Sequence, residues 1–208
     1  MMMQHSGLSD DIRWHWVAQD HGLPALLAPH ERERCRSFGS ADRRVSFVAG
    51  RTAVKQLVGR LYAMPPGQVS VLVQSDDSLA LETPGFISLA HSGAWAAAVW
   101  APHPIGIDVE HIQPRDPDLV HFLFSPDDQA TLDTLPGDRS EQLVLAWTLK
   151  EAVLKARRSG FRCSPKAIQL QVDAAVGMAH ATVRDTNEHW HLHFGRRTSY
   201  WWAVAYAV

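Results

Sequence analysis

Two segments of similar composition, one near the middle of the chain and one at its end, most restrict the folds that are open to it. The segment from Trp95 to Trp100 reads WAAAVW, and that from Trp202 to Tyr206 reads WAVAY. Each comes after a long stretch in which apolar residues recur with helical spacing. This order favours a duplicated arrangement of helix and antiparallel sheet, although strands of Ala, Val and aromatic residues are also common in unrelated proteins.

The hydrophobic pattern predicts helices and strands in two blocks. Helices are predicted over residues 30–38, 42–62, 126–132 and 139–158, and strands over residues 12–17, 68–74, 86–91, 95–101, 105–110, 167–172, 180–184, 190–194 and 202–208. Such blocks, without strict βαβ alternation, are typical of an α+β protein. We expect two similar helix-plus-antiparallel-sheet halves, residues 1–103 and 104–208, in a pseudo-twofold arrangement with the active site between them.

Composition excludes several classes of function. A formal charge of -2 and a pI near 6.6 predict no general attraction to nucleic acid or to an anionic membrane. The longest apolar run, Ala94 to Ala101, has eight residues and is too short to span a membrane. Met1 to Asp11 lacks the apolar stretch of a signal peptide, and Cys35 and Cys163 match no metal motif. We therefore expect a cytoplasmic protein.

The segment from Gly106 to Glu110 reads GIDVE and carries two carboxylates on a predicted strand. Asp108 and Glu110 are two residues apart, so their side chains share one face of that strand. Like charges at this spacing repel each other unless a cation lies between them. The segment therefore predicts either a cation site or, as the alternative, an exposed edge strand with two solvated carboxylates.

A second candidate lies on the predicted helix 139–158. Trp147, Glu151 and Lys155 are spaced four apart and form one stripe along that helix. A tryptophan in the stripe favours burial, and a buried glutamate needs a charged partner. The alternative is a solvated Glu–Lys pair, which stabilises a helix by only a few tenths of a kcal/mol.

A third candidate is the turn that follows the predicted strand 86–91. His91 ends the strand, and Ser92 and Gly93 form a tight turn whose backbone N–H groups point outward. Turns of this kind bind phosphate oxygens. The alternative is an ordinary hairpin turn with a lone histidine beside it.

Taken in order, the three candidates are similar to the signatures of the Sfp-type 4'-phosphopantetheinyl transferase family. The family has an S-H-S/Q-G turn, a G-I-D-x-E strand and a W-x-x-K-E-A-x-x-K helix, and this chain reads AHSG at 90–93, GIDVE at 106–110 and WTLKEAVLK at 147–155. Glu33-Arg34, Ala49-Gly50-Arg51 and the segment 124–128 also match, so the resemblance covers residues 31–162. The chain departs from the pattern at Ala90, where the family has serine, and at Asp128, where it has glutamate. The stretch 76–79 also lacks the lysine of the family's G-K-P segment.

The resemblance implies an enzyme that transfers the 4'-phosphopantetheine group of coenzyme A to a serine of an apo acyl or peptidyl carrier protein, releasing adenosine 3',5'-bisphosphate. The carrier would belong to fatty-acid, polyketide or nonribosomal-peptide synthesis, and the enzyme would be a monomer. It also implies the ligands of a Mg²⁺ ion in the C-terminal half, namely Asp108, Glu110 and Glu151. The N-terminal half would contact the phosphates of coenzyme A.

The resemblance further implies a role for each remaining candidate residue. The phosphates of coenzyme A would be contacted by Arg34, Arg51, His91, Ser92 and Lys150. Lys155 would stabilise or protonate the leaving nucleotide beside Glu151. The proton of the carrier serine would pass to Asp128, to Glu110 or to a metal-bound water.

Three other interpretations compete with this one. The first is an inactive coenzyme A-binding partner of carrier domains, which the missing lysine and serine favour slightly and the intact carboxylates oppose. The second is a serine hydrolase using Ser92, His91 and Asp108, which the absence of a G-x-S-x-G elbow opposes. The third is a zinc site at residues 189, 191 and 193, where three histidines alternate on a predicted strand and are expected to face solvent.

Overall fold

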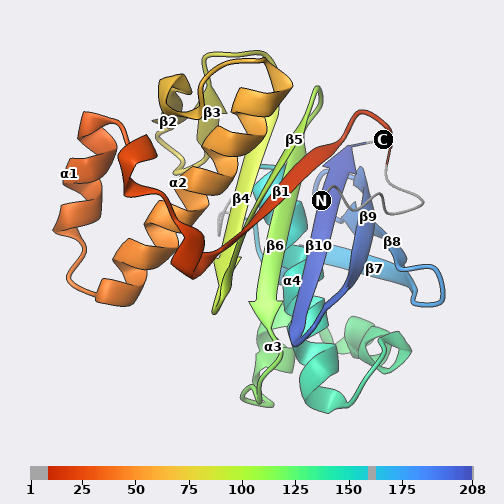
Figure 1. Ribbon diagram of the computed structural model, residues 1–208. Coiled ribbons are helices and arrows are strands. Elements are labelled where there is room, and N and C mark those ends of the chain that lie inside the picture. The colour runs from red at the N-terminus through yellow and green to blue at the C-terminus, as the bar shows by residue number, and fades with distance from the viewer. Residues whose placement is uncertain (1–8, 159–162, 208) are drawn as a thin grey trace. The chain divides into compact units, whose positions relative to one another are not determined.

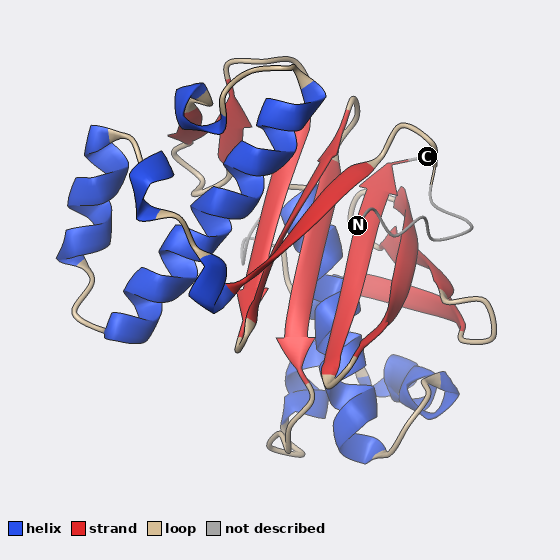
Figure 2. Cartoon of the chain, in the orientation of Figure 1, coloured by secondary structure: helices blue, strands red, loops and turns tan. Residues whose placement is uncertain are grey.

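The structure, a computed structural model, describes residues 9–158 and 163–207 of the chain. The chain divides into two compact units, Met1–Pro102 and His103–Val208, which we call the N-terminal and C-terminal units and describe separately. Both units combine helices with antiparallel sheet (Figures 1 and 2). The predicted α+β class is therefore confirmed.

The N-terminal unit is built from a three-stranded antiparallel sheet and one long helix. Its elements are β1 (Arg13–Ala18), α1 (Pro29–Ser37), α2 (Ala41–Leu61), β2 (Val71–Val73), β3 (Leu79–Leu81), β4 (Phe86–Ser92) and β5 (Trp95–Ala101), with 3-10 turns at Gln19–His21, Pro24–Leu26 and Pro66–Gln68. The sheet order is β1-β5-β4, and β2 pairs with β3. Helix α2 packs along the sheet (Figure 1), and the core between them includes Ala49 and Ala53 of α2 and Ala96 and Ala98 of β5, all fully buried.

The C-terminal unit is built from a five-stranded antiparallel sheet and the helix α4. Its elements are β6 (Ile105–His111), α3 (Leu119–Leu123), a 3-10 helix (Pro126–Thr134), α4 (Arg139–Ala156), a 3-10 turn (Pro165–Ala167), β7 (Ile168–Asp173), β8 (Met178–Val183), β9 (Glu188–Arg197) and β10 (Tyr200–Ala207). The sheet order is β6-β10-β9-β8-β7. A capping box begins α4, in which Asp138 accepts a hydrogen bond from the N–H of Glu141 at 3.0 Å.

Helix α4 lies very close to β6 because of Gly106. Alternate residues of a strand share a face, so Gly106, Asp108 and Glu110 all point towards the helix. A Cβ atom at Gly106 would lie 2.1 Å from the carbonyl oxygen of Ala152 and 2.4 Å from the backbone nitrogen of Ala156. No side chain fits at this position, and the two acidic residues that follow are held directly against α4.

The pattern-based elements differ from the structure in three places. Segment 126–132, predicted as an α-helix, belongs to the 3-10 helix Pro126–Thr134. The strand predicted over 68–74 begins only at Val71, because a 3-10 turn occupies Pro66–Gln68. Elements α3 and β3 were not predicted, since elements of five and three residues are too short to show a period. Across residues 9–158 and 163–207, the structure has no helix that is both long and apolar enough to cross a membrane.

Lys150 ties α4 to two other segments of the C-terminal unit. Its ammonium group donates hydrogen bonds to the carbonyl oxygens of Leu123 at 2.7 Å, Pro165 at 2.9 Å and Ile168 at 2.7 Å. The side chain is 1% exposed. An ammonium has three donors, and all three are used by backbone carbonyl groups here, so the contact of Lys150 with coenzyme A stays a prediction.

Replacing Gly106 by alanine should destabilise the protein, because the new methyl group would overlap the backbone of α4. We expect a loss of about 1–3 kcal/mol in the free energy of unfolding, the usual cost of overpacking. Urea denaturation of Gly106→Ala would measure it. Gly39→Ala is the matched control, because a Cβ there meets no heavy atom within 4 Å. Equal stability of the two variants would contradict the close contact between α4 and β6.

Lys150 should also make stability depend on pH. Burial lowers the pKa of Lys150 from its usual 10.5 to about 7, against the opposing effect of Asp128. Between these two values the unfolded chain binds more protons than the folded one, so the free energy of unfolding should rise with pH, by up to about 1.4 kcal/mol per pH unit. Lys150→Met should remove this rise, whereas Lys166→Met, at an exposed position, should keep it. Denaturation at pH 7 and pH 9 would show whether the slope persists without Lys150.

Candidate active site

Three carboxylates gather where β6 meets α4. Asp108 and Glu110 project from β6 and Glu151 projects from α4. Burial raises the pKa of all three carboxyl groups, and repulsion from Asp108 raises the pKa of Glu110 and of Glu151 further. The structure thus places the three predicted metal ligands within electrostatic reach of one another, and we call them the acidic cluster.

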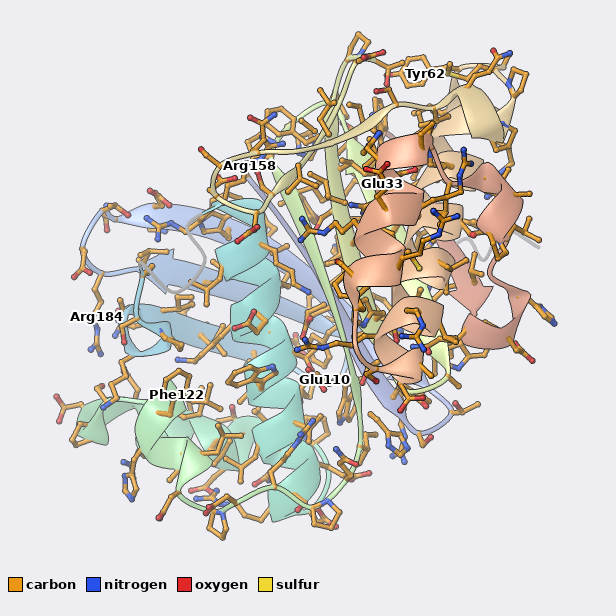
Figure 3. The ribbon with its side chains drawn as sticks, turned by 90° about the vertical axis from the view of Figure 1, so that its left-hand side faces the viewer. Glu33, Tyr62, Glu110, Phe122, Arg158 and Arg184 are labelled. Atoms are coloured by element: carbon orange, nitrogen blue, oxygen red, sulfur yellow. The ribbon has the colours of Figure 1, made fainter. Side chains whose placement is uncertain are left out.

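Two cations bind the acidic cluster from within the protein. The ammonium of Lys155 donates a hydrogen bond to Oδ1 of Asp108 at 2.7 Å. The guanidinium of Arg115, in the segment between β6 and α3, donates to Oε2 of Glu110 at 2.9 Å. Glu110 also accepts a hydrogen bond from Trp147, the aromatic residue of the predicted stripe. Figure 3 shows Glu110 beside α4. Arg115 was not predicted, because a residue in an irregular segment belongs to no periodic pattern.

Two oxygens of the cluster are buried and accept no hydrogen bond from the described residues, namely Oδ2 of Asp108 and Oε1 of Glu151. A buried, ionised oxygen without a partner is costly, so both atoms suit a bound cation. Carboxylate oxygens are ligands that Mg²⁺ prefers, and this donor set therefore fits that ion. Within the described ranges, however, no three His, Cys, Asp or Glu side chains are already arranged to hold a metal. Binding would require the side chains of the cluster to adjust.

Asp128 is not part of the acidic cluster. Its Oδ2 accepts hydrogen bonds from Arg184 at 2.6 Å and from Ser125 at 2.6 Å. Figure 3 shows Arg184 and Glu110 on opposite sides of α4. The hydrogen bond from Ser125 and the charge of Arg184 lower the pKa of Asp128, against the effect of its partial burial. Asp128 therefore lies away from the cluster and is paired with an arginine, and its role as proton acceptor stays a prediction.

Arg51 is also held inside the protein. Its Nε lies 3.0 Å from Oε1 of Glu31, and Nζ of Lys55 lies 3.1 Å from Oε2 of the same carboxylate. All three side chains are buried. Arg51 therefore joins α1 to α2, and its contact with coenzyme A stays a prediction. Glu31 and Lys55 were missed, although the position of Glu31 in the first turn of α1, where it accepts a hydrogen bond from the N–H of Ala28, was a signal for a capping role.

His91 lines a hollow of about 400 Å³ in the N-terminal unit. Its walls are formed by Phe38, Asp42, Arg43, Ser46, Phe47, Leu89 and His91. Gly93, at a φ of 50°, lies in the turn after β4 as predicted, whereas Ser92, also predicted in that turn, is the last residue of β4. Arg34 is exposed on α1, and its positive charge repels that of Arg51. Arg43 was not singled out from the sequence, because one arginine among several at the start of a helix carries no specific signal.

The histidines of β9 do not all face solvent. His189 is exposed and His191 is half-buried, but His193 is only 5% exposed. A ring nitrogen of His193 lies 3.1 Å from the hydroxyl oxygen of Tyr206, and the two rings stack. The expectation of a solvated row is therefore wrong for His193, because Tyr206 of β10 covers it.

Comparisons with known proteins agree with this geometry. Residues 104–205 match the model of the 4'-phosphopantetheinyl transferase superfamily. The 4'-phosphopantetheinyl transferase HetI of Nostoc sp. is 31% identical over 168 residues, covering 74% of this chain and 71% of the relative. A 4'-phosphopantetheinyl transferase of Bacillus subtilis is 25% identical, over 69% of this chain and 66% of its own. The transferase psf-1 of Bacillus pumilus is 29% identical, over 53% of this chain.

The matches to the two Bacillus relatives span 66% and 49% of those proteins. The match to HetI spans more than two thirds of both chains. The signature residues of the acidic cluster lie inside the segment that the superfamily model covers. The chain therefore belongs to the 4'-phosphopantetheinyl transferase superfamily.

Proposed function

We propose that the protein transfers the 4'-phosphopantetheine group of coenzyme A to a serine of an apo carrier protein, with Mg²⁺ as the metal. The observation that carries this proposal is the acidic cluster with Lys155 beside it. Burial raises the pKa of all three carboxyl groups, and repulsion from Asp108 raises the pKa of Glu110 and Glu151 further, so the ionised cluster is unfavourable in a protein without a cation to bind. Carboxylates that bind a cation are useful in a reaction whose substrate is a diphosphate.

The reaction breaks one phosphorus–oxygen bond of the coenzyme A diphosphate. The serine oxygen of the carrier forms a bond to the phosphorus that bears pantetheine, and adenosine 3',5'-bisphosphate leaves with the bridging oxygen. Mg²⁺, held by Asp108, Glu110 and Glu151, would neutralise charge on the diphosphate oxygens. Lys155 is one helical turn from Glu151 and 32% exposed, so its ammonium can reach the leaving phosphate and stabilise its charge.

The serine must also lose a proton. Asp128 lies away from the acidic cluster, so we assign this task to Glu110, which belongs to the cluster although Arg115 pairs with it. Burial raises the pKa of Glu110, and repulsion by Asp108 adds to that effect, which makes its carboxylate a better proton acceptor than a solvated one.

The hollow at His91 is the site that we propose for the nucleotide end of coenzyme A. The rings of Phe38 and Phe47 offer apolar surface for a base, and Arg43 and His91 offer donors for phosphate oxygens. Arg34, exposed on α1, is a further phosphate contact in this proposal. The hollow has a volume of about 400 Å³, which is at the lower end of the range of ligand sites.

Incubation of the protein with coenzyme A, Mg²⁺ and a panel of apo carrier proteins would test the function. We expect a mass increase of one phosphopantetheine group on at least one carrier, located on a serine. Carriers of fatty-acid, polyketide and nonribosomal-peptide synthesis should all be included. Absence of the modification from every carrier, with coenzyme A still bound, would identify an inactive coenzyme A-binding protein instead.

Glu151→Gln should abolish most of the transfer and preserve the fold. The change removes a negative charge from the cluster without adding volume, so the metal and the transition state lose a stabilising group. We expect the rate to fall by about two to three orders of magnitude. The metal-free variant should be at least as stable as the wild type, because repulsion with Asp108 and Glu110 is relieved. Asp133→Asn, in an exposed ion pair with Arg139, is the control. A folded Glu151→Gln protein with near-normal transfer would contradict the metal assignment.

Arg43→Ala should weaken binding of coenzyme A without changing the acidic cluster. A ligand that binds the folded state raises the melting temperature, and the rise depends on its affinity. We therefore expect coenzyme A to raise the melting temperature of the wild type more than that of Arg43→Ala. Arg36→Ala, at an exposed position of α1, is the control and should respond as the wild type does. An equal rise in Arg43→Ala would place the nucleotide elsewhere.

A further inference from the structure

The acidic cluster is almost neutralised by the protein itself. Its three carboxylates face two cations, Lys155 on Asp108 and Arg115 on Glu110, which leaves one net negative charge when all five groups are ionised. A divalent cation that entered beside both cations would leave a net positive charge in a half-buried site. Exchange of one internal cation for the divalent ion would leave the cluster neutral.

Lys155 is the internal cation that can leave. Its partner Asp108 is 5% exposed, and the second oxygen of that carboxylate, Oδ2, is buried and unpaired among the described residues. Lys155 itself is 32% exposed, so its flexible stem can carry the ammonium into solvent without unfolding α4. A strongly charged divalent ion gains more from two buried carboxylate oxygens than a single ammonium does.

The side chain of Arg115 is 31% exposed, close to the value for Lys155, but the backbone segment that carries Arg115 is held at both ends. The segment that carries it begins with a hydrogen bond of 2.8 Å from the N–H of Ile112 to the carbonyl oxygen of Ser199. It ends in a turn in which the N–H of Leu119 donates to the carbonyl oxygen of Asp116 at 3.0 Å. Pro114 and Pro117 stiffen the backbone on both sides of the arginine. The guanidinium can therefore remain on Glu110 while the ammonium moves.

We propose that Lys155 and Arg115 are built-in counter-ions of the acidic cluster, and that a divalent cation enters by displacing the Lys155 ammonium from Asp108 while Arg115 stays on Glu110. This inference rests on the proposed function, because the released ammonium would then be free for the phosphates of coenzyme A. Metal binding would thereby prepare the lysine for its part in the reaction. Metal and coenzyme A would bind cooperatively. The metal would take the place of Lys155 on Asp108 and so release the ammonium that coenzyme A needs.

The affinity of the free protein for Mg²⁺ tests whether a divalent ion displaces Lys155 from Asp108. Calorimetric titration of Mg²⁺, without coenzyme A or carrier, would compare the wild type with Lys155→Met. The variant keeps a long side chain on α4 and removes the competing charge, so we expect it to bind Mg²⁺ about tenfold more tightly, the order expected for one charge at close range. Arg139→Met is the matched control, because Arg139 lines the same hollow as Arg115 but pairs with the exposed Asp133, at 3.0 Å. Unchanged or weaker binding by folded Lys155→Met would overturn the proposal.

A second measurement uses the wild type alone and does not depend on a variant that folds. Acetylation of lysines by a water-soluble reagent, followed by peptide mass spectrometry, reports how free each ammonium is. We expect Lys155 to react several-fold faster with Mg²⁺ present, and the exposed Lys166 to react at the same rate in both conditions. No increase at Lys155 under saturating Mg²⁺, or no binding of Mg²⁺ at all, would overturn the exchange. Transfer to carriers is measured separately, so its failure would count against the proposed function and not against the exchange.

Discussion

The close approach of α4 to β6 at Gly106 is the contact on which the C-terminal unit depends. A helix that packs on a sheet through ordinary side chains leaves room for them between the two backbones. At Gly106 that room is absent, and the backbone of Ala152 and Ala156 lies where a side chain would begin. Asp108 and Glu110 are therefore placed on one side of the contact and Glu151 and Lys155 on the other. A polar site is thus built into the interface of a helix and a sheet, which would otherwise be apolar.

The buried charges of such a site must be balanced by opposite charges, and the two units of the chain balance theirs in different ways. In the N-terminal unit, Glu31 pairs with Arg51 and Lys55 in the core and joins α1 to α2. In the C-terminal unit, compensation by Lys155 and Arg115 leaves two buried oxygens without partners. The first cluster has one carboxylate for two cations, whereas the second has three carboxylates for two cations. Buried charge alone therefore does not distinguish a structural cluster from a functional one.

The sequence was sufficient to predict the α+β class, most strands and the three carboxylates, because period, spacing and family motifs are local properties. The contacts that Lys150, Arg51 and Asp128 make inside the protein were not predictable in this way. Each belongs to a matching motif, but what its side chain contacts depends on distant segments, such as the carbonyl of Ile168 for Lys150 and Arg184 for Asp128. Arg115 and Arg43 were missed for the complementary reason. They contribute through position alone, and neither lies in a pattern that a linear sequence displays.

Lys150 and Glu151 are neighbours in α4, yet they serve opposite electrostatic environments. Lys150 points into three carbonyl oxygens, and Glu151 points into the acidic cluster. Successive residues of an α-helix are separated by about 100° around its axis, so a shift of α4 by one residue would rotate one side chain towards the other's site. A shift in one direction would turn the carboxylate of Glu151 towards the carbonyl oxygens, which have no proton to donate to it. A shift in either direction would remove the ammonium of Lys150 from those carbonyl oxygens. This pair of adjacent, opposite charges therefore fixes the rotational register of the helix, which apolar packing around Leu149 and Val153 alone would define less strictly.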